Sequence, residues 1–135
     1  MAKKKAYDPA KDATYMSDEM RAFFRDHLLA WKAEIMAETQ ATVDNLKREH
    51  VSYPDPADTA AANADRTLEL RARDRQRKLV GKIDQALRRI EDGEYGYCEH
   101  TGEEIGVGRL LARPIATLSI EAQEAHERGE RLRAG

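Results

Sequence analysis

The chain has 135 residues, of which 36% are charged and only 6% aromatic, so we expect one small domain with a solvated helical extension. Its 23 lysine and arginine residues and 25 acidic residues give a formal net charge of −2, which excludes an overall positive field that would gather nucleic acid. One cysteine excludes an internal disulfide, and the sequence shows no apolar signal segment or membrane span, so we expect a cytoplasmic protein.

The first 16 residues are expected to form a flexible tail. Three lysines, Lys3 to Lys5, are followed by small and polar residues. A short lysine run at a chain end is typical of a solvated terminus rather than of a nucleic-acid patch. We therefore assign no function to this segment.

A first long helix is predicted from Ser17 to about Val51. Asp18 and Glu19 follow Ser17, and acidic residues in a first turn favour a helix start. Apolar residues then recur at steps of three and four positions, the pattern of one buried helix face. This stripe consists of Met20, Phe24, Leu28, Trp31 and Ile35, continued more weakly by Thr42 and Leu46.

A proline-containing turn follows, with the sequence Tyr53-Pro54-Asp55-Pro56-Ala57-Asp58. Because a helix cannot continue through these prolines, the chain is expected to reverse here, and the flanking helices can lie antiparallel. Asp55 suits a helix cap and Asp58 favours the helix dipole, so local chemistry alone makes both aspartates structural. They also place two carboxylates at the end of a long hairpin.

A second helix is predicted from about Pro56 to Asp92, with Gly93 as its C-terminal stop. Its apolar seam is expected to pack on the first helix as an antiparallel coiled coil. The seam residues are Leu68, Ala72, Leu79, Ile83, Ala86, Leu87 and Ile90.

The middle of this second helix is strongly basic. It contains Arg71, Arg73, Arg75, Arg77 and Lys78, interrupted only by Asp74 and uncharged residues. One interpretation is a solvated face with weak intrahelical ion pairs. The other is a positive band that holds an anionic partner. The sequence leaves both open.

The last part of the chain is predicted to form a small globular head. Glycine, aromatic and turn residues between Gly93 and Ile105 indicate a tight knuckle. Ser119 is expected to cap a final helix that has acidic residues at its start and arginines near its end. The head should pack on the start of the first helix, around Phe23, Phe24 and Trp31.

The predicted fold is therefore mainly all-α, a long antiparallel coiled-coil hairpin with a small globular head and a C-terminal helix. We expect a tail over residues 1–16 and a hairpin over residues 17–92, with its tip at 53–60 and with residues 17–32 also packed on the head. The head and last helix occupy residues 93–135.

Several of these segments together resemble the DksA/TraR family of bacterial RNA polymerase-binding transcription factors. They are the basic stretch from Leu68 to Leu79, the proline turn, Tyr95-Gly96-Tyr97-Cys98, Gly102-Glu103-Glu104-Ile105-Gly106 and Arg109-Leu110-Leu111-Ala112-Arg113-Pro114. The similarity runs in order from about Tyr15 to Gly135. It implies a coiled coil whose acidic tip enters the secondary channel of RNA polymerase. It also implies cooperation with guanosine tetraphosphate in the stringent response, at ribosomal RNA and amino-acid biosynthesis promoters.

The resemblance assigns roles to individual residues. It implies tip contacts with the polymerase for Asp55, Asp58 and Ala60. For the guanosine tetraphosphate interface it implies Arg75, Leu79, Lys82 and Arg113, and pyrophosphate groups suit such basic side chains. Ala72 and Gln123 stand where the family has an asparagine and a lysine at that interface, which predicts weaker binding, while Glu121 keeps the charge of the family's aspartate.

The family's head usually binds a structural zinc through two Cys-x2-Cys pairs, and here the pairs are degenerate. The four positions hold Cys98, Thr101, Ser119 and Ala122. Zinc needs four soft or imidazole ligands, and even with His100 the set falls short, so we expect no bound zinc and no intrinsic cofactor. The head should then be held by apolar contacts among Tyr95, Tyr97, Ile105, Val107, Leu110, Leu111, Ile115, Leu118 and Ile120.

Two other function classes remain open. One is a transcript-cleavage factor of the Gre type, whose tip carboxylates hold Mg²⁺. The other is a redox- or metal-responsive helical adaptor built around Cys98, although Glu99 beside it is expected to raise the thiol pKa and a buried, inert cysteine is favoured. No catalytic triad or phosphate loop is present, so we expect no enzyme activity. We also expect a monomer without sequence-specific DNA binding or membrane association.

Overall fold

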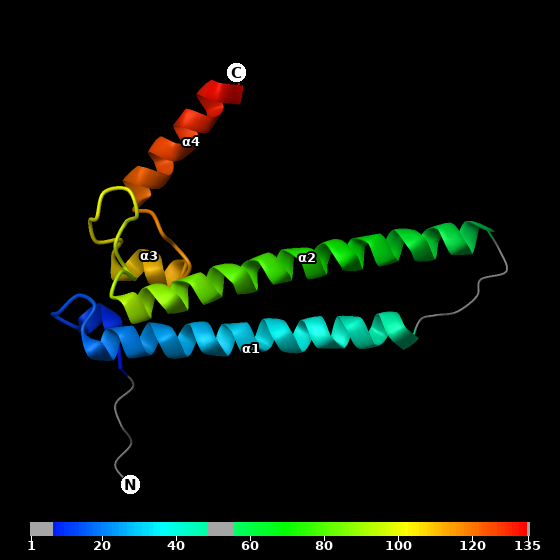
Figure 1. Cartoon of the computed structure of the whole chain (residues 1–135), viewed down its shortest axis with the longest axis horizontal. Coiled ribbons are helices and arrows are strands. Elements are labelled where there is room, and N and C mark those ends of the chain that lie inside the picture. Colours follow the sequence, from blue (N-terminus) through cyan, green and yellow to red (C-terminus); the bar gives the residue numbers. More distant parts are fainter. Residues whose placement is uncertain (1–6, 49–55, 135) are drawn as a thin grey trace, which may run out of the picture. The chain divides into compact units, whose positions relative to one another are not determined.

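The computed structural model describes residues 7–48 and 56–134, and these are mostly helical. A short 3₁₀ helix, η1 (Pro9–Lys11), precedes α1 (Asp18–Arg48), α2 (Pro56–Asp92), α3 (Val107–Ala112) and α4 (Ile120–Ala134) (Figure 1). Within the described ranges the only β-type pairing is an isolated bridge between Tyr97 and Glu104. The expected helical fold class is confirmed.

Helix α1 starts where its local signals place it. The Ser17 hydroxyl accepts a hydrogen bond from the backbone N–H of Met20 at 3.2 Å, which satisfies one of the free donors of the first turn. Asp18 lies in that turn and forms an ion pair with Arg21. The helix is described to Arg48, so its predicted last residues lie outside the described part of the chain.

Helix α2 has the predicted bounds. Pro56 is its first residue and Asp58 lies in its first turn. At the other end the amide N–H groups of Glu94 and Tyr95 both bond to the carbonyl of Arg89. Gly93 adopts a φ of +76°, a conformation that side-chain-bearing residues rarely adopt, and it ends the helix as expected.

The chain divides into two compact units, and α1 and α2 contribute to both. The first unit comprises residues 1–28 and 85–135. The centres of the Phe24 and Tyr95 rings lie 5.6 Å apart, so the head lies against the start of α1 at Phe24. Trp31, which was also expected there, belongs to the second unit. Its buried apolar residues are Met16, Met20, Phe24, Leu28, Ala86, Ile90, Tyr95, Cys98, Ile105, Leu110 and Ala116.

The core of this unit differs from the prediction at two positions. Leu111 and Ile120 were expected to be buried, but they are 45% and 55% exposed. Helix α3, which was not predicted, turns Leu110 inward and the next residue outward. Of the remaining predicted head residues, Tyr97, Val107, Ile115 and Leu118 are half-buried.

The N-terminal segment also departs from the expected flexible tail. Residues 1–6 lie outside the described part, but residues 7–16 are folded onto the first unit and include η1. Pro9 and Met16 are buried. The sequence prediction failed because the contacts of this segment are with residues far away along the chain.

The second unit, residues 29–84, is a pair of antiparallel helical segments, one from α1 and one from α2 (Figure 1). Lys32 forms an ion pair with Asp84 at 2.7 Å, and the Thr39 hydroxyl lies 2.8 Å from Oε1 of Gln76. Among the described residues of this unit, the buried apolar ones are Ile35 and Ile83. Leu68, expected in the seam, is 61% exposed. None of the described helices could span a membrane.

Candidate functional site

The predicted polymerase tip lies at the start of α2. Asp58 and Ala60 are both exposed on the first turns of this helix. Asp58 lies where free backbone N–H groups and the helix dipole favour a carboxylate. Asp55 lies outside the described residues. The structure therefore gives the setting of two of the three predicted tip residues.

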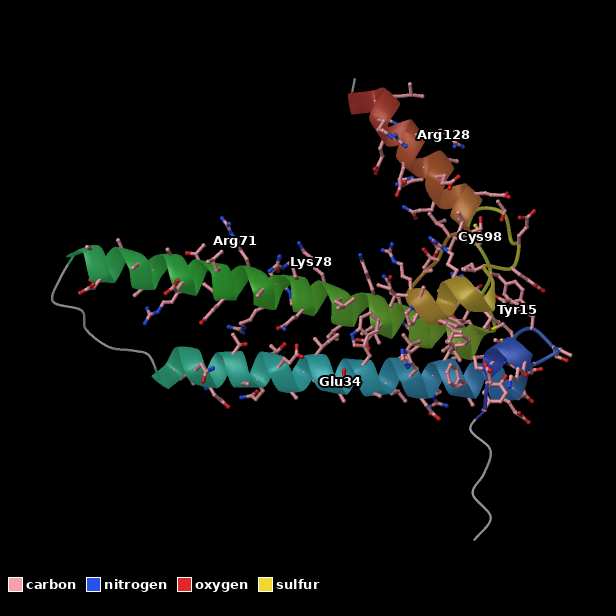
Figure 2. The ribbon with its side chains drawn as sticks, turned by 180° about the vertical axis from the view of Figure 1, so that it is seen from behind. Tyr15, Glu34, Arg71, Lys78, Cys98 and Arg128 are labelled. Atoms are coloured by element: carbon pink, nitrogen blue, oxygen red, sulfur yellow. The ribbon has the colours of Figure 1, made fainter. Side chains whose placement is uncertain are left out.

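Four basic residues form one face of α2 in the second unit, and we call them the basic band: Arg71, Arg75, Lys78 and Lys82. Their spacing of four, three and four positions places them on one side of a helix. All four are exposed. Figure 2 shows Arg71 and Lys78 on the side of α2 away from α1.

Asp74 neutralises only part of this positive charge. Its carboxylate pairs with Lys78 at 3.1 Å and with Arg77 at 2.7 Å. The pKa of Asp74 is lowered, mainly by the hydrogen bond and the positive charge of Lys78 and further by the Arg77 guanidinium. Within the described ranges, no carboxylate forms an ion pair with Arg71, Arg75 or Lys82. Ion pairing with Asp74 thus accounts for Arg77 and Lys78. The anion-binding interpretation remains for Arg71, Arg75 and Lys82.

The predicted effector residues are distributed over both units. Leu79 is half-buried on α2 between Arg75 and Lys82. Arg113 is exposed in the first unit, where it follows α3 and its backbone N–H bonds to the carbonyl of Arg109. Gln123 also belongs to the first unit and bonds to Glu127 along α4.

The four degenerate zinc positions lie in the first unit, and three of them converge. Cys98 is 3% exposed. The Thr101 hydroxyl and the backbone N–H groups of His100, Thr101 and Ser119 lie close enough to its sulfur to affect the pKa of the thiol. The loop is closed by the bonds from Cys98 N to Glu103 O at 2.7 Å and from Gly102 N to Cys98 O at 2.9 Å. A backbone bond from Glu99 N to Thr117 O ties it to the segment before α4.

These donors determine the protonation of the thiol. Burial raises the pKa of Cys98, but the hydrogen bonds from Thr101, Ser119 and His100 together outweigh burial and lower the pKa to about 6. The expected increase caused by Glu99 does not occur. The Glu99 carboxylate instead pairs with Arg89 at 3.1 Å.

The side chains at these positions do not fit a structural zinc ion. Ala122 offers no ligand atom, and the Ser119 hydroxyl accepts a hydrogen bond from the backbone N–H of Ala122. One thiolate and two hydroxyls are a poor set for zinc, which prefers four sulfur or imidazole ligands. His100 is exposed, and across residues 7–48 and 56–134 no group of three His, Cys, Asp or Glu side chains is placed to hold a metal.

Arg89 and Tyr15, which were not among the predicted site residues, organise the knuckle, which comprises residues 93–106 in the structure. Arg89, at the end of α2, bonds through its guanidinium to the carbonyl groups of Glu94 and Tyr97 as well as to Glu99. An arginine in the last turn before a glycine is a known capping signal and could have been noticed. Tyr15 bonds to both sides of the knuckle, and its local sequence gives no indication of this.

Comparison with known proteins identifies the family. A family model described as the N-terminal domain of the DnaK suppressor protein DksA matches residues 20–90. A second, described as the prokaryotic dksA/traR C4-type zinc finger, matches residues 93–128. The chain belongs to the DksA family.

Relatives in the DksA family match almost the whole chain. The RNA polymerase-binding transcription factor DksA of Caulobacter vibrioides is 56% identical over 132 residues, covering 98% of this chain and 93% of the relative. The protein of the same name from Escherichia coli is 42% identical, covering 96% and 85%. Among solved structures, transcription factor DksA2 from Pseudomonas aeruginosa has a TM-score of 0.82 at 45% identity, covering 89% of this chain and 92% of the other.

Proposed function

We propose that this protein is an RNA polymerase-binding transcription regulator that inserts the end of its α1–α2 hairpin into the secondary channel of the enzyme. The observation that carries the proposal is the match of almost the whole chain, including both hairpin arms and the head, to relatives named RNA polymerase-binding transcription factors. Such a factor acts on the polymerase rather than by catalysis of its own. This role agrees with the chain's balanced charge, which favours a protein partner over direct DNA binding.

At the tip, Asp58 makes the essential contact in this proposal, with Asp55 and Ala60 in supporting positions. Asp58 is an exposed carboxylate in the first turn of α2, so it is open to solvent and held at a fixed place on a helix. A carboxylate in such a position can interact with polar or positively charged groups of the polymerase.

The basic band supports a response to guanosine tetraphosphate. Arg75 and Lys82 are exposed cations without a carboxylate partner among the described residues, and pyrophosphate groups are suitable anions for them. Leu79 and Arg113 complete the proposed interface. Ala72 and Gln123 remove two polar contacts that the family uses, so the affinity is reduced. The response concerns ribosomal RNA and amino-acid biosynthesis promoters.

We also propose that the protein works without zinc, as a cytoplasmic monomer. The donor set at Cys98, Thr101, Ser119 and Ala122 supports zinc independence, because it provides a single thiolate.

Transcription in vitro from a ribosomal RNA promoter tests the proposal. We expect the purified protein to lower the transcript yield, and guanosine tetraphosphate to lower it further. Failure of the protein to retain polymerase in a pull-down would contradict the proposal. Cleavage of nascent RNA in backtracked complexes would assign the protein to the Gre type instead.

Asp58→Asn tests the tip within the same assay. Since contacts to charged groups contribute more than neutral ones, we expect the concentration for half-maximal inhibition to rise about tenfold or more. Asp65→Asn is the matched control, because Asp65 is also an exposed aspartate on α2 but lies about two turns further along. Equal effects of the two substitutions would show that Asp58 has no specific role in inhibition.

A further inference from the structure

The N-terminal segment from Tyr7 to Ser17, which we call the strap, fastens the knuckle, residues 93–106. The Tyr15 hydroxyl donates a hydrogen bond to the carbonyl of Gly96 at 2.6 Å and accepts one from the backbone N–H of Gly106 at 3.0 Å. Gly96 and Gly106 lie on opposite sides of the knuckle, which are also joined by a bond from Ile105 N to Gly96 O. One side chain of the strap thus links both sides of the loop.

Close packing accompanies these two hydrogen bonds. The Tyr15 and Tyr97 rings meet edge to face with centres 5.7 Å apart. Met16 is 8% exposed, and a Cβ atom added at Gly96 would lie 2.7 Å from Cε of Met16 and 3.0 Å from the Tyr15 hydroxyl. Burial raises the pKa of Tyr15, consistent with a hydroxyl that stays protonated and donates. The strap therefore lies directly against the knuckle backbone.

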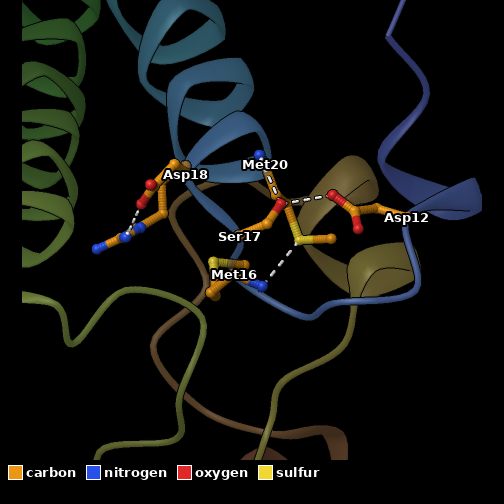
Figure 3. Close-up of polar contacts among 6 residues, drawn as sticks. Asp12, Met16, Ser17, Asp18 and Met20 are labelled. Carbon is orange, nitrogen blue, oxygen red and sulfur yellow. Dashed lines mark hydrogen bonds and ion pairs between the residues drawn. The ribbon is translucent and has the colours of Figure 1, made fainter.

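Hydrogen bonds also hold the strap in place where it joins α1. The Asp12 carboxylate accepts hydrogen bonds from the Tyr7 hydroxyl, the Ser17 hydroxyl and the backbone N–H of Thr14. Ser17 in turn caps α1, and Figure 3 shows it between Asp12 and the Met20 amide. Together with the bond from Met16 N to the Met20 sulfur, these contacts fix the position from which Tyr15 extends.

Met16 shows how strongly this position is determined. Its φ of +53° is unfavourable for a residue with a side chain, and it is the only such residue other than glycine in the described part of the chain. Backbone of this kind persists where the surrounding contacts outweigh its cost. Here those contacts are the buried Met16 side chain and the neighbouring Tyr15 hydrogen bonds.

The knuckle needs a cross-link from elsewhere in the chain. It contains four glycines with positive φ, Gly93, Gly96, Gly102 and Gly106, so its own backbone preferences do not hold it in one conformation. A structural metal ion normally supplies such a cross-link, but the side chains at the four zinc positions do not fit one.

We propose that the strap takes over the cross-linking role of a metal ion in this head. The Tyr15 hydroxyl makes the cross-link, because it bonds to both Gly96 and Gly106. The role is internal to the first unit and does not depend on polymerase binding. Its failure would therefore leave the proposed function untouched.

Tyr15→Phe in the full-length protein tests this inference, with Cys98 as a local reporter. Because Cys98 is buried within the knuckle, a thiol reagent labels it only when the knuckle opens. We expect Tyr15→Phe to raise the labelling rate of native protein about tenfold or more, since the partly buried bonds to the Gly96 carbonyl and the Gly106 amide are lost. The thermal unfolding midpoint should also fall.

Tyr97→Phe is the matched control. It removes a hydroxyl from the other ring of the same aromatic pair, and among the described residues the Tyr97 hydroxyl makes no hydrogen bond. We expect its labelling rate to stay close to the wild-type rate. A wild-type rate in Tyr15→Phe, or equal increases in both variants, would overturn the inference.

Hydrogen exchange of the wild-type protein gives a second measurement that needs no variant. The Gly106 amide has the Tyr15 hydroxyl as its acceptor and should be protected from exchange to a degree similar to the Ile105 amide, which bonds to Gly96 O. An unprotected Gly106 amide beside a protected Ile105 amide would show that the strap does not hold the knuckle.

Discussion

At the scale of single residues, Cys98 shows how hydrogen bonds can outweigh burial. A thiolate in an apolar site is unfavourable, but here fixed N–H and O–H donors surround the sulfur. The donors come from Thr101, Ser119 and His100, which lie at or beside the predicted zinc positions. The loops therefore keep an arrangement suited to a negatively charged sulfur.

The Cys98 thiol should make the stability of the protein depend on pH. Its pKa is about 6 when folded, below the ordinary value near 8.5 of an unfolded chain. The thiolate therefore stabilises the fold fully above about pH 8.5, and this contribution is lost as the pH falls through 6. Urea unfolding of wild type and Cys98→Ser at several pH values should show a stability difference that grows in favour of wild type with rising pH. Parallel pH profiles would contradict this assignment.

At the scale of elements, the paired segments of the second unit are packed unevenly. Ile35 and Ile83 are buried, whereas none of the described side chains from Met36 to Lys82 is. A cavity of about 500 Å³ lies among residues of both segments. Nε of Arg73 and Oε2 of Glu69 are buried and have no hydrogen-bond partner among the described residues. Unpaired buried polar atoms and open packing both lower local stability.

Substitutions along α2 should reveal this difference in packing. Ile83 is fully buried and Leu68 is 61% exposed, although both belong to the apolar seam predicted from the sequence. Ile83→Ala should lower the free energy of unfolding by about 2–5 kcal/mol. Leu68→Ala should change it by about 0.5 kcal/mol or less. Urea denaturation measures both, and similar losses would show that Leu68 is buried in solution.

The basic band can be tested on the same helix. Arg75→Ala and Lys82→Ala should each raise the guanosine tetraphosphate concentration for half-maximal response about tenfold, because each removes a charge-assisted contact to phosphate. Arg77→Ala is the control, since Arg77 is exposed but pairs with Asp74. Arginine and alanine are both good helix formers, so helix content should not change in the two arginine variants. A response unchanged by Arg75→Ala and Lys82→Ala would locate the nucleotide elsewhere.

At the scale of the whole molecule, the head keeps the family's fold while losing its usual metal ligands. Arg89, Tyr15 and the backbone bonds around Cys98 connect segments that a zinc ion would otherwise hold. Tyr95 adds a buried hydrogen bond from its hydroxyl to the carbonyl of Pro114 at 2.7 Å. Several hydrogen bonds and an apolar core thus connect the segments of the head, and the Tyr15 contacts are among them.

Removal of metal should consequently leave the protein intact. After treatment with a strong chelator, we expect the thermal unfolding midpoint and inhibition of a ribosomal promoter to be unchanged, because the four zinc positions offer a single thiolate and should bind no structural zinc. A lowered midpoint that recovers on addition of zinc would contradict this expectation.

The sequence by itself determined where the long helices begin and where α2 ends. The residues that start or stop these helices act on backbone groups only a few positions away, so their effects can be recognised from local sequence. They are Ser17, Pro56, Gly93 and Ser119. The three- and four-residue spacing likewise identified Phe24, Ile35 and Ile83 as core residues.

The tertiary structure alone decided the role of the N-terminal segment, the environment of Cys98 and the exposure of Leu68 and Ile120. Tyr15 and Gly96 are 81 positions apart, and no local pattern predicts that they meet. A helical period shows which side chains share a face, but burial depends on what packs against that face. The sequence therefore predicted the helices, and only long-range contacts showed how the head is held together.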